Sequence, residues 1–441
     1  MANNTTAETN YVELDDLKST LLNDDAAADP RTDYYVSQDK TIHTTLSEVA
    51  TKKQKKRKLR IILSVCLLSC CCIALWGVII LFLIGWFSIG DYLWHVAFGI
   101  DPEHCDLFRE STIANFTILH DCPPLTEPQS QWKDKLSRYW VPLNKTEAVK
   151  FNSRDADWLP NFGQTEIVGT LLKQDFINST SKFVIVVHGY RVCRFRYESM
   201  LPAGILYHLG YNVLQIDLRN HGDSPVFKKV PYVSFGSFEH LDVLGGVDFL
   251  TQRYPFLATT NNIGVFGTSM GAATSVVAFA RETNLKVAFV DSPPCDVFGT
   301  LSFAAKQVVG SSALVDIALA AVKSVSMIKA PLMGFPPFHN DPKQLLTNLD
   351  LSGNRKLFFL QGVGDLVVPT FNHYVCLNAT MESVTRNGYS RENVESFLAD
   401  IHYPFEVKDR KRDYCNNHIA FMFNRLNEFV DMLGGFFTRN L

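Results

Sequence analysis

A serine enclosed by glycines lies near the middle of the chain, in the pentapeptide GTSMG at residues 267–271. An apolar, strand-like run at 263–266 precedes it, and a helix-like segment at 272–282 follows it. In a Gly-x-Ser-x-Gly turn the glycines let strand and helix approach closely, and the serine hydroxyl projects above the sheet. The pattern predicts that Ser269 is a nucleophile and that the Met270 backbone N–H binds an oxyanion. A strand–turn–helix with an incidental serine is the alternative interpretation.

A hydroxyl nucleophile needs a base, and the base needs an acid that orients it. In this arrangement the acid follows the serine in the chain, and the histidine follows the acid. Asp365 lies in a glycine-containing loop at 362–369, directly after the strand-like run 356–360. We therefore predict Asp365 as the acid. A turn-capping aspartate is the alternative for Asp365, and Asp291 after the preceding strand is the fallback acid.

Three histidines follow the predicted acid: His373, His402 and His418. His373 falls in the helix directly after the acid and is too close to act as the base. His418 comes just before an amphipathic segment at 421–436, and the loop entering the last helix is where a base is expected. His402 follows the last strand-like run, 394–399. We predict His418 as the base and keep His402 as the second choice.

A His-Gly-Tyr sequence at 188–190 ends the strand-like run 182–187. The Tyr190 backbone N–H is expected to be the second oxyanion donor. Arginines follow at once, and Arg191 and Arg194 are candidate ligands for a phosphate or carboxylate of the substrate. A solvated loop is an equally good interpretation of these arginines. The proposed chemistry requires no metal and no organic cofactor.

Strand-like and helix-like segments alternate from about residue 148 to the end of the chain. This alternation predicts an α/β fold with a mostly parallel central sheet, helices on both faces, and an active site at the carboxyl ends of the strands. An apolar, helical insertion at about 296–350 is expected to form a lid, which would suit an acyl chain. The strand-like runs are 182–187, 212–217, 263–266, 286–290, 356–360 and 394–399, and the helix-like segments are 198–209, 238–252, 271–282, 372–385 and 421–436.

A membrane-spanning helix is expected before this domain. Seven of the nine residues at 52–60 are Lys or Arg, whereas 61–90 contains no charged residue. That run exceeds the roughly 20 residues that cross a bilayer. We predict a span at 61–85, with Trp86 and Trp94 near the far interface. A buried core helix or a cleaved signal peptide fits less well.

The basic cluster orients the chain, because positive residues flank the cytosolic end of a span. We expect residues 1–60 to be a disordered cytosolic tail, 86–147 a juxtamembrane segment, and 148–441 the catalytic domain, both in the lumen or outside the cell. The net charge of −3 gives no reason to expect a nucleic-acid partner. Four Asn-x-Ser/Thr sequons follow the span and are predicted glycosylation sites. They begin at Asn115, Asn144, Asn178 and Asn378.

Six cysteines lie beyond the span and permit three disulfides in an oxidising compartment. Cys105–Cys122 is a plausible local pair, but sequence alone does not fix the connectivity, and some of the six could be buried thiols. The six are Cys105, Cys122, Cys193, Cys295, Cys376 and Cys415.

Four blocks in this order resemble the α/β-hydrolase superfamily, and the serine aminopeptidase-like group in particular: VHG at 187–189, DLRNHGDS at 217–224, GTSMGAAT at 267–274 and GDLVVP at 364–369. The resemblance covers about 230 residues, from His188 to His418. It implies the same triad and oxyanion donors. The layout is also similar to that of single-pass, glycosylated lysophosphatidylserine lipases of the endoplasmic reticulum.

We therefore expect a membrane-anchored serine hydrolase that cleaves carboxylic esters of lipids or lysolipids through an acyl-enzyme. A serine peptidase of the aminopeptidase type and a catalytically silent binding protein are the alternatives. An intact triad argues against the silent protein, and fold-level resemblance does not choose the substrate.

Overall fold

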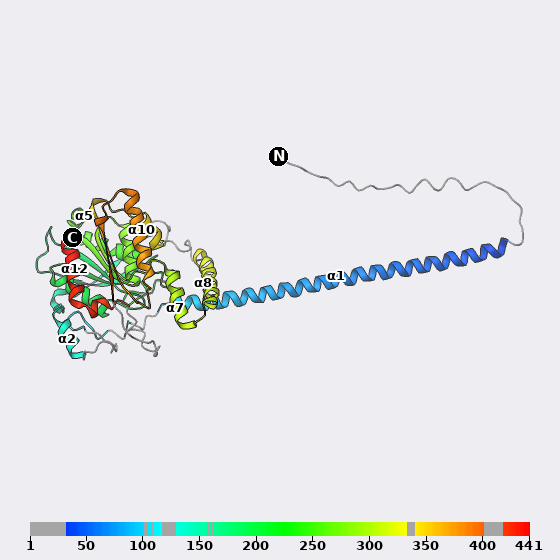
Figure 1. Ribbon diagram of the computed structural model, residues 1–441, viewed down its shortest axis with the longest axis horizontal. Coiled ribbons are helices and arrows are strands. Elements are labelled where there is room, and N and C mark those ends of the chain that lie inside the picture. Colours follow the sequence, from blue (N-terminus) through cyan, green and yellow to red (C-terminus); the bar gives the residue numbers. More distant parts are fainter. Residues whose placement is uncertain are drawn as a thin grey trace. The chain divides into compact units, whose positions relative to one another are not determined.

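The computed structural model describes residues 32–441 except 101–104, 107–108, 117–128, 157–158, 160–161, 333–339 and 401–417. The chain divides into two compact units, Met1–Phe82 and Leu83–Leu441. Helix α1, Thr32–Phe98, begins in the first unit and ends in the second (Figure 1). The second unit contains the sheet and all the predicted catalytic residues.

Within the described residues, α1 is the helix that is long and apolar enough to cross a membrane, over Ser47–Phe98. It begins well before the basic cluster, so residues 32–60 are helical where we expected a disordered tail. Lys, Arg, Gln and Leu are all good helix formers, which lets the helix continue through that cluster. Trp94 also differs from expectation, because it is buried against Tyr232 and Phe98 within the second unit.

Eight strands form one sheet in the order β1-β2-β4-β3-β5-β6-β7-β8. Only β2 runs antiparallel to its neighbours, and the strands from β4 to β8 pair in parallel. Strands β3, β4, β5 and β7 are buried at every residue, which explains their continuous apolar runs. The bounds are β1 Thr146–Asn152, β2 Glu166–Leu172, β3 Phe183–Val187, β4 Asn212–Asp217, β5 Ile263–Thr268, β6 Leu285–Asp291, β7 Lys356–Gly362 and β8 Val394–Ala399.

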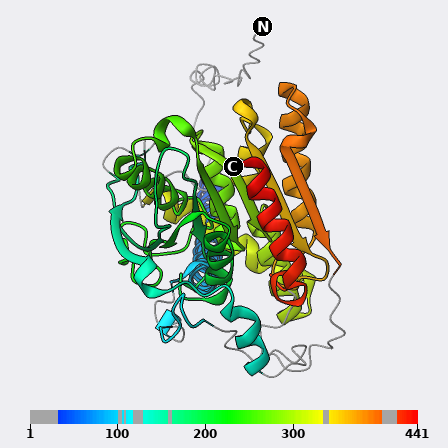
Figure 2. The same ribbon diagram turned by 90° about the vertical axis from the view of Figure 1, so that its left-hand side faces the viewer.

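Helices cover both faces of the sheet (Figure 2). On one face the core includes α4 (His240–Arg253), α6 (Met270–Arg281) and α10 (Phe371–Asn387). On the other face it includes α3 (Tyr197–His208) and α12 (Leu426–Asn440). This is the predicted α/β-hydrolase fold. The shorter helices are α2 Gln129–Ser137, α5 Leu257–Thr260 and α11 Phe421–Asn424.

The expected insertion between β6 and β7 is helical. It contains α7 (Val297–Val309), α8 (Ser312–Leu332) and α9 (Pro342–Thr347). Gly310 separates the first two helices with a φ of 71°, a left-handed conformation that glycine adopts easily. The insertion therefore has the composition expected of a lid, and its function as a lid remains a prediction.

The amino-terminal boundary of the sheet domain lies earlier than expected. Strands β1 and β2 were missed. Strand β1 is a partly exposed edge strand without a long apolar run. Ile113 and Phe116, from the segment expected to be juxtamembrane, are buried in the core beneath α3 and α12. The predicted helix 421–436 is also divided, since Arg425 has a non-helical φ of −129° between α11 and α12.

Two disulfides connect distant parts of the second unit. Cys105 pairs with Cys193, so the predicted Cys105–Cys122 pair is wrong. The two Cα atoms lie 5.8 Å apart although 88 residues separate them in sequence, a tertiary contact that local spacing cannot reveal. Cys295 pairs with Cys376 and connects the start of the insertion to α10. The other two of the six cysteines, at positions 122 and 415, lie outside the described residues.

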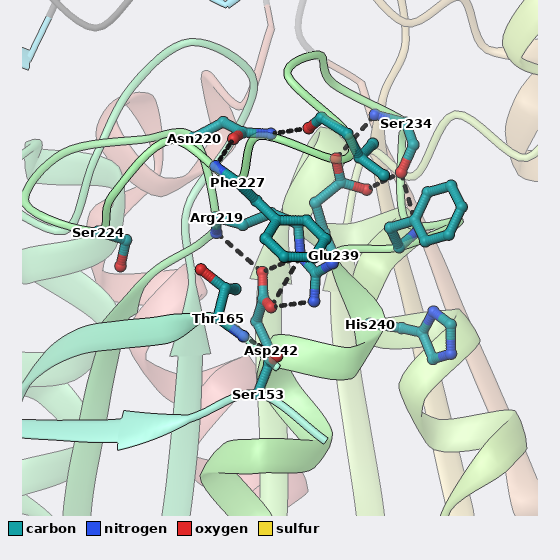
Figure 3. Close-up of polar contacts among 12 residues, drawn as sticks. Ser153, Thr165, Arg219, Asn220, Ser224, Phe227, Ser234, Glu239, His240 and Asp242 are labelled. Carbon is teal, nitrogen blue, oxygen red and sulfur yellow. Dashed lines mark hydrogen bonds and ion pairs between the residues drawn. The ribbon is translucent and has the colours of Figure 1, made fainter. Parts of the chain in front are cut away.

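A buried polar network fixes the long loop between β4 and α4 (Figure 3). The Arg219 guanidinium donates to Asp242 Oδ1 at 2.6 and 2.9 Å, and the Arg219 backbone N–H donates to Asp242 Oδ2 at 2.8 Å. The Asn220 amide donates to two carbonyls further along the loop. The Glu239 carboxylate accepts from the Ser234 and Gly236 backbone N–H groups. The loop is therefore bonded to α4 through Asp242 and is also fixed by bonds within the loop and to Glu239.

We predict that Asp242→Ala lowers the free energy of unfolding by about 3–5 kcal/mol, because it leaves the buried Arg219 charge without its partner. The matched control is Asp248→Ala on the same helix. Asp248 also pairs with an arginine, Arg154, but that pair is partly exposed, and its loss should cost about 0–1 kcal/mol. Urea denaturation followed by tryptophan fluorescence measures both. Equal costs for the two variants would contradict the network's role.

Candidate active site

Ser269 occupies a strained turn between β5 and α6. Its φ of 55° and ψ of −122° lie outside the regions that non-glycine residues usually adopt. A methyl group added to Gly267 would collide with the Gly271 carbonyl oxygen, and one added to Gly271 would collide with the His188 carbonyl oxygen. Strand, helix and the neighbouring 188–190 turn can approach this closely only because both positions are glycine. The strain is thus imposed at the residue that carries the hydroxyl.

The predicted acid and base are in direct contact. Asp365 is buried, and its Oδ2 lies 2.7 Å from His418 Nδ1. Its Oδ1 accepts from the Val367 and Val368 backbone N–H groups at 2.8 and 2.9 Å. The carboxylate is therefore fixed in orientation. Since Nδ1 faces the acid, Nε2 is the imidazole nitrogen left to accept a proton.

His373 is not placed as the base. His373 is buried within α10, and burial lowers its pKa to about 4. His402 lies outside the described residues. Among the residues that the structure describes, His418 is therefore the histidine beside the acid.

The serine, the acid and the base lie at the end of the sheet where the parallel strands have their carboxyl ends. Strands β5, β6 and β7 are adjacent and parallel, so their carboxyl ends coincide. The Ser269 backbone N–H donates to the Asp291 carbonyl at 2.8 Å, across the β5–β6 boundary. The charge of Asp291 in turn acts on His418.

Opposing effects set the pKa of His418. Burial alone would lower it, but the neighbouring Asp365 carboxylate and the charges of Glu198 and Asp291 outweigh burial, so the pKa of His418 is raised. Burial also raises the pKa of Asp291 to about 7. Asp291 Oδ2 has no hydrogen-bond partner among the described residues, and His418 bonds to Asp365 instead. Asp365, rather than the fallback Asp291, is therefore the carboxylate in contact with His418.

The expected oxyanion turn packs directly against the serine. A Cβ atom on Gly189 would lie 3.4 Å from Ser269 Cβ. His188 is fully buried, and its Nε2 accepts from the Leu218 backbone N–H at 3.0 Å, so its Nδ1 carries the proton and donates to the Gly189 carbonyl. Burial holds the pKa of His188 well below its ordinary value. His188 is therefore a neutral, structural side chain that shapes the turn.

The end of α1 supports the same turn. The Tyr190 hydroxyl donates to the Ala97 carbonyl at 3.0 Å. The Arg191 guanidinium donates to the Val96 and Gly99 carbonyls at 3.0 Å each. The last carbonyls of a helix have no partner within it and carry partial negative charge, so a cationic group there is stabilising.

This arrangement corrects the expectation for the two arginines. Arg191 is engaged by the carbonyls at the end of α1 rather than free for a substrate. Arg194 is buried, and it pairs with Asp217 and, at 2.7 Å, with Asp223. Both guanidinium groups bond to groups of the protein itself, because buried carboxylates need a charged partner and the carbonyls at a helix end need a hydrogen-bond donor.

Sequence reasoning missed Glu198, a buried carboxylate beside the site. A Cβ atom on Gly189 would lie 2.9 Å from Glu198 Oε1, and the carboxylate pairs with Arg196 at 3.2 Å. Its charge contributes to the raised pKa of His418. In the sequence it is an ordinary acidic residue in the first turn of a helix, and no local signal marks it.

The fold and the site together define an α/β-hydrolase-type domain with a serine, a histidine and an aspartate at one sheet edge. Similar solved structures include an esterase of Pyrococcus furiosus, with 22% identity over 68% of this chain and 96% of that chain, and a TM-score of 0.48. An acylaminoacyl peptidase of Pyrococcus horikoshii has 14% identity over 72% and 44%, with a TM-score of 0.44. Dipeptidyl peptidase 4 of Porphyromonas gingivalis has 15% identity over 67% and 35%, with a TM-score of 0.42. No protein-family model and no curated protein sequence matches the chain.

We predict a pH–rate profile whose acidic limb lies above pH 6.5, the ordinary value for histidine. The base must be neutral, and the raised pKa of His418 keeps it protonated to higher pH. Asp365→Asn removes the charge that raises this pKa, so the limb should move to lower pH. The same change should lower kcat on the order of 10⁴-fold, because the imidazole loses its correct tautomer.

The matched control is Asp291→Asn, which removes a neighbouring buried carboxyl group but leaves the His418 hydrogen bond intact. It should cost less than about tenfold in kcat. The profiles can be measured on a soluble short-chain nitrophenyl ester. An unmoved acidic limb in Asp365→Asn would show that another group is the base.

Proposed function

We propose that the chain is a membrane-anchored serine hydrolase that cleaves carboxylic esters through an acyl-enzyme on Ser269. One observation carries the proposal. A buried Asp365 carboxylate bonds at 2.7 Å to an imidazole, His418, at the sheet edge where Ser269 occupies a strained turn. A serine hydroxyl is a weak nucleophile, and this is the set of groups that activates it.

The mechanism follows from these positions. His418 Nε2 takes the proton as Ser269 Oγ attacks the ester carbonyl carbon. The Tyr190 and Met270 backbone N–H groups stabilise the oxyanion. The imidazolium, held by the Asp365 carboxylate, then protonates the departing alcohol. Water, deprotonated by the same imidazole, attacks the acyl-enzyme and releases the acid and the free serine. This sequence needs no cofactor.

A lipid or lysolipid is the substrate class that we favour. Aromatic rings line the side of the oxyanion turn, with Tyr190 stacked on Phe235 at 5.3 Å between ring centroids. Phe98 from the end of α1 contacts both Phe235, at 6.0 Å, and Phe298 of the insertion, at 6.4 Å. Apolar and aromatic surroundings with few polar groups suit an acyl chain.

We place the catalytic domain on the non-cytosolic side of a membrane, with the amino terminus in the cytosol. The basic cluster before the apolar run of α1 supports this orientation. The two disulfides support an oxidising compartment. We propose glycosylation at the four sequons, whose asparagines are all exposed as acceptors must be. They are Asn115, Asn144, Asn178 and Asn378.

A fluorophosphonate probe tests the nucleophile. We expect the detergent-purified full chain to be labelled, and Ser269→Ala to lose all labelling. Ser275→Ala is the control, since Ser275 is a buried serine on the following helix turn. Labelling that persists in Ser269→Ala would exclude Ser269 as the nucleophile.

Substrate class needs a separate measurement. Lipid profiles of cells that express the wild type or Ser269→Ala should differ in acyl esters, which accumulate in the variant. Turnover of long-chain acyl esters should also exceed turnover of aminoacyl amides. The reverse preference would favour a peptidase with the same site.

A further inference from the structure

Helix α8 of the insertion exposes large apolar side chains near its start and near its end. The residues between these two ends include Ala321, Val322 and Val325, which are buried against the protein. A helix at a water-facing surface normally carries polar residues on its outer side. The exposed residues that share one side are Leu314 at 59%, Ile317 at 56% and Ile328 at 45%. We call this set the α8 stripe.

The α8 stripe belongs to a helix that packs on the end of the proposed membrane anchor. A Cβ atom on Gly90 would lie 2.8 Å from the Ala321 carbonyl oxygen and 2.9 Å from Val325, so the two helices cross in close contact (Figure 1). Lys329 forms an ion pair with Asp91 at 2.6 Å and lies 4.1 Å above the ring of Trp94. All these residues are in the second unit.

This contact places α8 close to the end of the apolar run. Gly90 is the last residue of the uncharged stretch 61–90, and Gly85 is the expected end of the span. At 1.5 Å per residue the two glycines are separated by only about 7.5 Å of helix. The same part of α1 exposes Ile89, Tyr92 and Val96, which share one helix face.

We propose that α8 lies in the interfacial region of the non-cytosolic leaflet, with the α8 stripe among the lipid acyl chains. The proposal rests on the membrane-anchored hydrolase inferred above and deepens it, because it makes the bilayer the source of the ester substrate. A bilayer, rather than a second protein, is the occupant that the continuity with the anchor favours. Lys306, in the last turn of α7, is exposed and would reach the headgroups.

The insertion also connects this membrane contact to the catalytic site. Phe298 of α7 contacts Phe98, and Phe98 contacts Phe235 beside the oxyanion turn. The Cys295–Cys376 disulfide holds the start of α7 to the body of the domain. A change in the depth of α8 in the interface would thus alter the packing of the side chains next to Ser269. An ester in the bilayer would be hydrolysed well, and a water-soluble ester would not need the stripe.

Photo-crosslinking of the full chain in phosphatidylcholine–phosphatidylserine nanodiscs tests the location of α8. Benzoylphenylalanine is introduced at position 317, within the α8 stripe, or at position 323, on the polar side of the same helix. We expect lipid adducts from position 317 and few from position 323. Equal, low lipid adducts from both positions, or crosslinks from 317 to a second copy of the chain, would overturn the proposal.

Kinetics test the consequence. The variant Leu314→Ser/Ile317→Ser/Ile328→Ser should lose on the order of tenfold in kcat/KM for a long-chain lysolipid presented in vesicles. Its turnover of a soluble short-chain ester should stay within about twofold of wild type. The control Asp316→Ser/Lys323→Ser should change neither rate. An unchanged vesicle rate in the stripe variant would contradict the proposal.

The outcomes separate this proposal from the proposed function. If Ser269 is not the nucleophile, Ser269→Ala will retain both ester activities, whatever the crosslinks show. If the hydrolase is correct but α8 is not interfacial, Ser269→Ala will be inactive while position 317 gives no lipid adduct.

Discussion

The hydrogen bond between Asp365 and His418 joins a loop at the end of β7 to a turn 53 residues later in the chain. The aspartate side of this bond is fixed by backbone N–H groups at the end of a buried strand. The histidine side is fixed by the residues that follow it, because Ile419, Phe421 and Met422 are buried in the core. An imidazole held in this way needs no reorganisation when it accepts a proton. The position of the last two helices therefore matters to the site as much as the strand ends do.

The ends of the strands, and the side of the sheet where the site lies, could be predicted from sequence because buried parallel strands have continuous apolar runs. Strands β3 to β7 are buried on both faces, so they read as continuous apolar runs, and a glycine-rich turn follows β5. Ser269, Asp365 and His418 could be selected because each follows or precedes such an element. Strand β1 gave no comparable signal, since most of its residues are partly exposed.

What could not be predicted depends on contacts between residues far apart in the chain. The roles of Arg191 and Arg194 follow from carbonyls at the end of α1 and from carboxylates on the β4 loop. An arginine in a loop looks the same in sequence whether it binds a substrate or a helix end. The Cys105–Cys193 disulfide, across 88 residues, is hidden for the same reason.

The end of α1 has a structural role in the catalytic unit as well as its proposed role as an anchor. Its last carbonyls accept from Tyr190 and Arg191, the two residues after the glycine that packs on Ser269. The same helix end contacts α8 through Gly90 and Asp91. The end of α1, the insertion and the 188–190 turn thus share one set of contacts. This is consistent with an enzyme whose activity depends on where the bilayer holds it.

The most direct measurement of the central claim is an experimental structure of the full chain after reaction with an alkyl phosphonate. We predict phosphorus bonded to Ser269 Oγ, with a phosphoryl oxygen in hydrogen-bond contact with the Tyr190 and Met270 backbone N–H groups and His418 Nε2 facing the adduct. A phosphonate on another residue, or an imidazole at position 418 turned away from a modified Ser269, would contradict the account.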